Sequence, residues 1–211
     1  SLTDLPTEGQ TALFPEKMKS LEIGVRIVNK PKGIPDIDQI EFQGSFFRND
    51  YTDKMRVTYL LGMPVGYYEN VGIADMVGYE GNAKFKFYNG LMVADAGFSK
   101  YNVSDLSVFP FKSTSKLTGK VTGEWKFISF GYRWFRESEQ IGWILLPREG
   151  YKEIELPSFS NYDFSMTFDL NVGPVKGQLS YAGRNLKKND TTLDGLLLRD
   201  TRKYITFSAE F

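Results

Sequence analysis

Alternation of apolar and polar residues along most of the chain is the feature that most limits its fold. In the clearest stretch, from Tyr162 to Val172, every second residue is apolar or aromatic, and the residues between are Asp, Ser, Thr or Asn. After Gly173 and Pro174 the same alternation resumes. A period of two is the spacing of a β-strand with two different faces, whereas an amphipathic helix repeats every 3.6 residues. The two stretches are predicted to form a hairpin, and the chain is predicted to be all-β.

The same alternation predicts about ten strands. They cover residues 20–28, 39–48, 54–67, 80–88, 91–99, 116–124, 126–135, 162–172, 175–183 and 203–211. Short links at 49–53, 89–90, Trp125 and 173–174 alternate with longer links at 29–39, 68–79, 100–115, 136–161 and 184–202. This asymmetry is typical of membrane barrels, which have short periplasmic turns and long extracellular loops. It favours a closed, antiparallel, up-and-down transmembrane β-barrel over residues 20–211, with eight and twelve strands as alternatives, preceded by an N-terminal tail or plug at 1–19.

The physics of the bilayer supports closure. The longest apolar runs hold about four residues, whereas a membrane-spanning helix needs about twenty. In hydrocarbon every backbone N–H and C=O must be paired, and strands achieve this only in a closed barrel. Alternation alone does not tell the inside from the outside, because a one-residue shift exchanges the two faces. A soluble β-barrel or sandwich around an apolar ligand is therefore the alternative fold.

Composition excludes much catalytic chemistry. The 211 residues include no histidine and no cysteine. Catalysis by Ser-His-Asp or Cys-His groups, disulfides, and nearly all zinc sites are therefore excluded. Lys and Arg number 26, as do Asp and Glu, so the formal charge is zero. That balance argues against nucleic acid as a partner, because binding to phosphates favours a basic excess.

The final strand, Lys203 to Phe211, resembles the C-terminal signature of bacterial outer-membrane β-barrel proteins. That signature is a terminal aromatic residue preceded by apolar residues at alternate positions. Phe211, Ala209, Phe207 and Ile205 match it, although Ala209 is smaller than usual. The resemblance implies a Gram-negative outer membrane, its lipid as surroundings, and recognition of this strand by the barrel-assembly machinery. Small enzymes of this class depend on a catalytic histidine, so no enzymatic activity is expected.

Polar residues on the inward faces of the strands are the candidates for lining a lumen. They are Glu22, Arg26, Glu41, Arg56, Lys84, Lys86, Asp95, Lys120, Glu124, Arg133, Asp163, Asp169, Lys176 and Glu210. One interpretation is that these charges pair across a narrow lumen and fill it. The other is that unpaired charges set the ion preference of a pore. Both remain open from the sequence.

Aromatic residues on the opposite faces are candidates for interfacial girdles, or for the core of a soluble barrel. They include Tyr59, Tyr67, Phe87, Trp125, Trp134, Tyr181 and Phe211. Two acidic groups, Asp36/Asp38/Glu41 and Asn49/Asp50/Asp53, could bind a hard cation. Ordinary turn chemistry of Asp and Asn explains them better.

Two functions are compatible with a membrane barrel. The first is transport: a narrow, porin-like channel for small solutes, or a barrel that passes an apolar compound sideways into the membrane. The second is a binding, adhesive or structural role through the long loops, with Val108–Phe111 and 136–161 as contact candidates. An apolar loop such as Val108–Phe111 can also fold into the mouth of a barrel as a plug. The soluble alternative binds an apolar ligand. No cofactor, metal site or catalytic residue is predicted, and the solute is not specified.

Overall fold

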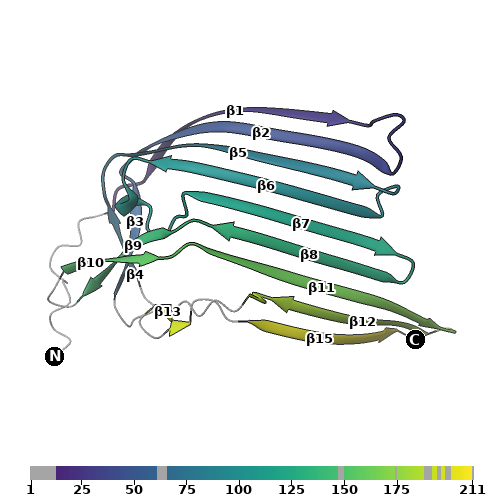
Figure 1. Ribbon diagram of the computed structural model, residues 1–211. Coiled ribbons are helices and arrows are strands. Elements are labelled where there is room, and N and C mark those ends of the chain that lie inside the picture. Colours follow the sequence, from purple (N-terminus) through teal and green to yellow (C-terminus); the bar gives the residue numbers. More distant parts are fainter. Residues whose placement is uncertain are drawn as a thin grey trace.

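The computed structural model describes residues 13–60, 66–146, 150–173, 175–187, 192–193, 196–197 and 201–210. Its main feature is one antiparallel nine-stranded sheet, in which strands that follow one another in the sheet also follow in the chain (Figure 1). The strands are β1 (Lys17–Asn29), β2 (Ile37–Thr52), β5 (Ala74–Phe87), β6 (Met92–Val103), β7 (Ser115–Trp125), β8 (Ile128–Glu137), β11 (Phe159–Val172), β12 (Val175–Arg184) and β15 (Arg202–Glu210). No helix in the described part of the chain is long and apolar enough to cross a membrane.

The strand register gives the sheet two chemically different faces. One transverse row joins Ile27, Phe42, Ala83, Ala96, Gly119, Trp134 and Tyr162 as direct partners across β1 to β11. The row one residue further along joins Val28, Glu41, Lys84, Asp95, Lys120, Arg133 and Asp163. Because partners in register point the same way, the first row belongs to an apolar face and the second to a polar face.

A four-stranded sheet lies at one end of the large sheet. Its strands are β3 (Met55–Leu60), β4 (Gly66–Asn70), β9 (Gln140–Leu146) and β10 (Gly150–Leu156). They form two hairpins, which come from the β2–β5 and β8–β11 connections and join through a parallel β3–β9 pairing (Figure 1). A two-stranded sheet, β13 (Thr192–Leu193) and β14 (Leu196–Leu197), lies in the β12–β15 connection. A short 3-10 helix, η2 (Leu106–Val108), follows β6.

The small sheet corrects two predictions. Residues 54–67 were predicted to cross the large sheet, but β3 and β4 pair outside it. The predicted loop 136–161 instead contains β9 and β10. With these changes the short connections are 30–36, 88–91, 126–127 and 173–174, and the long ones are 53–73, 104–114, 138–158 and 185–201. The predicted alternation of short and long links is confirmed. The first two links differ from the prediction: the first, predicted to be long, is short, and the second, predicted to be short, is long.

The large sheet is open among the described residues. β1 and β15 form its two edges (Figure 1). The all-β, antiparallel, up-and-down arrangement is confirmed, with nine strands instead of about ten, and closure into a barrel stays a prediction. The predicted tail at 1–19 includes the first residues of β1, which begins at Lys17.

Candidate functional site: the polar face and its mouth

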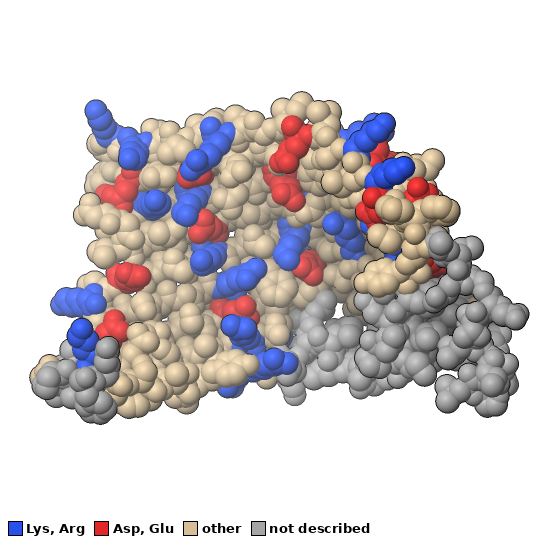
Figure 2. Space-filling view, turned by 180° about the vertical axis from the view of Figure 1, so that it is seen from behind, with Lys and Arg blue, Asp and Glu red and all other residues tan. Residues whose placement is uncertain are grey.

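The strands place the predicted lumen residues on one face. All of them except Arg56 lie at polar-face positions of the large sheet. For Glu210 this refers to its register position opposite Lys176. The exception, Arg56, lies in β3 of the small sheet. Acidic and basic side chains are interspersed over this face of the sheet (Figure 2).

Few of these charges form ion pairs within the described residues. Arg26 Nε lies 2.5 Å from Glu41 Oε1, and the Arg26 side chain is 63% exposed. Arg56 Nε lies 2.8 Å from Glu69 Oε1 in the adjacent strand of its hairpin. Among the residues that the structure describes, those of the row from Lys84 to Asp163 form no ion pair. Most of these charged side chains are therefore not paired with one another and can interact with a molecule that lies against the polar face.

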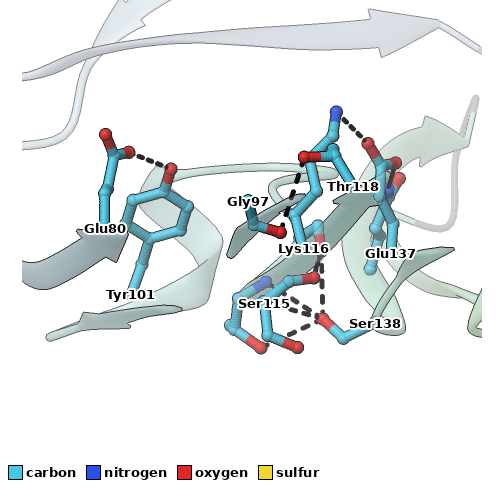
Figure 3. Close-up of polar contacts among 11 residues, drawn as sticks. Glu80, Gly97, Tyr101, Ser115, Lys116, Thr118, Glu137 and Ser138 are labelled. Carbon is cyan, nitrogen blue, oxygen red and sulfur yellow. Dashed lines mark hydrogen bonds and ion pairs between the residues drawn. The ribbon is translucent and has the colours of Figure 1, made fainter. Parts of the chain in front are cut away.

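A polar hollow of about 320 Å³ lies in the middle of this face. Gly97 forms its floor, because the Thr118 hydroxyl occupies the space beside the glycine Cα that a side chain would fill. Thr118 Oγ1 donates to the Gly97 carbonyl at 3.4 Å (Figure 3). The Asn82 amide donates to the Ala96 carbonyl at 3.3 Å. Gln43, Ser45 and Ser99 add further uncharged hydrogen-bonding groups to its lining.

Opposite charges flank this hollow. Glu80, Ser99 and Lys116 are consecutive partners across β5, β6 and β7, so one small residue separates the carboxylate from the ammonium. Tyr101 OH donates to Glu80 Oε1 at 2.6 Å, and Lys116 Nζ lies 2.7 Å from Glu137 Oε1 (Figure 3). Both charged groups are therefore held at the edges of the hollow by neighbouring side chains.

The connection after β6 folds onto the polar face at the long-loop end. Val108 and Phe109 are buried against Ala74 and Met76 of β5. Phe47, Tyr51 and Tyr101 pack around this core and bring aromatic rings to the same place. Val108 and Phe109 are thus not exposed contact residues. Burial removes these apolar side chains from water. Folding of this loop into a barrel mouth as a plug stays a prediction, because closure of the barrel does.

Hydrogen bonds to the Ser138 side chain connect the end of the 104–114 segment to the end of β8. Its hydroxyl oxygen lies 3.1 Å from the Thr114 amide and 3.2 Å from the Ser115 amide, both of which donate to it (Figure 3). The hydroxyls of Ser113 and Thr114 also lie 3.2 Å away. One side chain therefore provides an acceptor for two backbone donors where the loop returns to β7.

Three cations, Lys54, Lys112 and Arg56, lie at the long-loop end of the polar face, around the buried Val108 and Phe109; we call this end the mouth. Lys54 Nζ lies 2.8 Å from Glu16 Oε2 and 5.0 Å from the centre of the Tyr51 ring. Lys112 Nζ lies 4.6 Å from the centre of the Tyr101 ring, a cation–π arrangement. Arg56 donates to the Ser107 carbonyl at 3.2 Å and so joins β3 to η2.

Two ionisable groups of the mouth have shifted pKa values. Burial lowers the pKa of Lys112; the charge of Glu80 opposes this shift and that of Lys54 adds to it. Burial alone would raise the pKa of Glu16, but hydrogen bonds from Lys54 and the Met55 amide, with the Lys54 charge, lower it below its ordinary value. The sequence did not single out Lys54 or Lys112. Lys54 was assigned to the predicted strand 54–67, and Lys112 lies in a predicted loop, which has no period that shows where its side chains lie.

Comparison with known proteins decides the family. The family described as TonB dependent receptor-like, beta-barrel, matches residues 2–186. The chain belongs to the TonB-dependent receptor β-barrel family. Its members are bacterial outer-membrane proteins, so the predicted outer-membrane location is confirmed.

Solved structures of outer-membrane proteins share the fold. The siderophore receptor PirA from Acinetobacter baumannii matches with a TM-score of 0.55 and 15% identity, over 82% of this chain and 28% of PirA. The copper transporter OprC matches with a TM-score of 0.56 and 17% identity, over 93% of this chain and 31% of OprC. The FrpB iron transporter from Neisseria meningitidis matches with a TM-score of 0.51 and 17% identity, over 81% of this chain and 27% of FrpB. The chain therefore spans less than a third of each of these proteins. No curated protein matches the chain.

Membership of the TonB-dependent receptor family gives the apolar face a natural environment. Its side chains are strongly exposed, with Ile23 66%, Val25 62% and Ile205 77% exposed. An outer-membrane barrel turns such a face toward lipid. Phe87, Trp134 and Tyr181 lie on this face by register, and Trp125 is 60% exposed next to a short turn. The side chains of Tyr59, Tyr67 and Phe211 lie outside the described residues.

The acidic groups singled out in the sequence have turn and ion-pair roles. Asp36 and Asp53 adopt positive φ angles of 69° and 53°, as Asp does in tight turns. Asp38 accepts the Gly90 amide at 2.9 Å, and Asp50 pairs with Arg48 at 2.9 Å.

Three residues of the predicted C-terminal assembly signature lie in the edge strand β15: Ile205, Phe207 and Ala209. The fourth, Phe211, lies outside the described residues.

Proposed function

We propose that this chain forms part of the wall of a TonB-dependent transporter that takes up a small solute across the outer membrane. The observation that carries the proposal is the two-faced sheet with a hollowed polar side. The 104–114 connection folds onto the polar face at the end where the long connections lie, and the short turns lie at the other end. Long extracellular loops and short periplasmic turns are the usual arrangement of outer-membrane barrels. The mouth would therefore face the outside of the cell.

The open edges indicate that further strands complete the wall. An unpaired strand edge in hydrocarbon leaves a row of N–H and C=O groups without partners, and each costs several kcal/mol. β1 and β15 therefore require neighbours in the membrane. Outer-membrane transporters close at about 22 strands around a plugged lumen. Nine strands would supply part of such a wall.

The names of the structural relatives suggest the class of solute. They are a siderophore receptor, an iron transporter and a copper transporter. We infer that a metal ion or a metal complex is the first class to test. The polar hollow and the cations of the mouth suit a hydrophilic solute better than an apolar compound, because their lining offers hydrogen bonds and charge.

Uptake in cells tests the proposal. A strain that lacks the receptor would be compared with one that carries it, using radioactive iron complexed by siderophores, and radioactive copper. The expected result is accumulation of at least one of these solutes only with the receptor, and its loss when TonB is deleted. Uptake that persists without TonB, together with steady conductance of the purified protein in a planar bilayer, would instead indicate an open channel and overturn the proposal.

A further inference from the structure

The charge pattern of the polar face is interrupted between β7 and β8. Along the central row, Glu41, Lys84, Asp95 and Lys120 alternate in sign from strand to strand. Arg133, the next residue, is the direct partner of Lys120. Like charges directly opposite each other destabilise a sheet. The wall thus has two adjacent cations where regular alternation would place a carboxylate.

A hollow of about 240 Å³ lies at this interruption. Lys120, Arg133 and Arg184 contribute to its lining from β7, β8 and β12. Gly131 opens its centre, because a side chain there would meet the Ser165 hydroxyl at 2.8 Å. Thr122 and Ser165 are the register partners of Gly131 on either side. Three cations and two hydroxyls therefore border one space.

The acidic neighbours do not neutralise this hollow. Among the described residues, Asp163 is the only carboxylate in its lining, and its Oδ1 accepts the Asn185 amide at 2.9 Å. Asp95 is the direct register partner of both Lys84 and Lys120. Within the described part of the chain, Lys120, Arg133 and Arg184 make no ion pair. The charge of the hollow is therefore positive.

We propose that this hollow binds an oxyanion, either a carboxylate or a phosphate group. Arginine presents its N–H groups in a planar fork that matches the two oxygens of such an anion, and a lysine adds a point charge. The Thr122 and Ser165 hydroxyls can donate to the remaining oxygens. The proposal rests on the proposed function in one respect, since it takes the polar face as the wall of the lumen. The anion belongs to a solute in transit, or to an acidic side chain of a protein segment inside the lumen.

Binding of citrate and of inorganic phosphate to the purified, detergent-solubilised receptor tests the proposal. Calorimetry would compare the wild type with Arg133→Gln, Arg133→Lys and the control Lys86→Gln. Lys86 lies on the same face and does not line the hollow, and its replacement by Gln removes the same positive charge. We expect saturable binding that weakens about tenfold in Arg133→Gln, weakens less in Arg133→Lys, which keeps the charge but loses the planar fork, and is unchanged in Lys86→Gln. Equal weakening in Arg133→Gln and Lys86→Gln would show a diffuse field and overturn the proposal.

A second measurement identifies the source of the anion. A carbodiimide joins Lys120 to any carboxylate in contact with it, and mass spectrometry then identifies the partner. A cross-link to a carboxylate other than Asp95 and Asp163 supports an acidic protein segment as the occupant. Saturable citrate or phosphate binding without such a cross-link supports a solute. A receptor that shows neither result has no oxyanion site here, whereas its uptake activity is measured separately and would leave the transport proposal standing.

Discussion

At the scale of single residues, Ser138 has a clear structural role as a hydrogen-bond acceptor. Its hydroxyl is the acceptor for the Thr114 and Ser115 amides, and half-burial limits their replacement by water. Ser138→Ala removes that acceptor and leaves donors unsatisfied, which costs about 1–3 kcal/mol. We expect faster proteolytic cleavage within 104–114 and faster hydrogen exchange at both amides. Ser99→Ala, in the polar hollow of the same face, is the control; equal exchange in the two variants would contradict the assignment.

The Glu16–Lys54 pair predicts a pH dependence at the same scale. Because the folded protein lowers the pKa of Glu16, the pair stabilises the mouth at pH values above the ordinary carboxylate range. This stabilisation is lost as the pH falls through the lowered pKa. Hydrogen exchange of residues 13–16 and 53–56 should therefore accelerate on acidification, by an amount equivalent to about 1 kcal/mol. In Glu16→Gln this acid-dependent step should be absent, and a step of unchanged size would show that another group causes it.

At the scale of elements, alternation predicted the strands of the large sheet and failed in the long connections. Residues 54–67 alternate as clearly as any strand, but alternation is local and does not say which sheet a strand joins. The strands β9 and β10 were missed because the run from Trp143 to Leu146 is apolar throughout and shows no alternation in the sequence. The polar face was predictable because its positions follow from the same period of two. The burial of Val108 and Phe109 was not, since it depends on contacts between distant segments.

The 104–114 connection contacts strand β9, and this contact can be tested by substitution. Phe111 donates its amide to the Ile141 carbonyl at 2.7 Å, and its ring occupies the space that a side chain at Gly142 would fill. Gly142→Val should therefore displace Phe111 and separate the 104–114 connection from β9, at a cost of about 1–3 kcal/mol. Proteolysis of both connections measures the effect. Gly44→Ala is the control, because its nearest atom is the Glu80 carbonyl oxygen at 3.7 Å. Resistance of Gly142→Val equal to that of the wild type would show that Phe111 does not hold the two connections together.

At the scale of the whole molecule, the central question is which face meets lipid. In an outer-membrane wall the apolar face meets acyl chains and the polar face meets water, whereas a soluble barrel would turn the apolar face inward. The chain contains no cysteine, so single cysteines can be introduced without removing others. β7 is the best strand for this, because Leu117 and Val121 lie on the apolar face and Thr118 and Thr122 on the polar face.

Cysteines at these four positions distinguish the two orientations through quenching by lipid, because the polar face meets water in both. In the intact receptor, a charged, membrane-impermeant maleimide should label Thr118→Cys and Thr122→Cys and spare Leu117→Cys and Val121→Cys. A fluorophore on Leu117→Cys or Val121→Cys should be quenched by a nitroxide on a lipid acyl chain, and one on Thr118→Cys or Thr122→Cys should not. The heat-dependent mobility of each variant on a denaturing gel controls for folding. Absence of quenching at all four positions in folded variants would contradict the membrane wall and would indicate a water-soluble barrel closed around its apolar face.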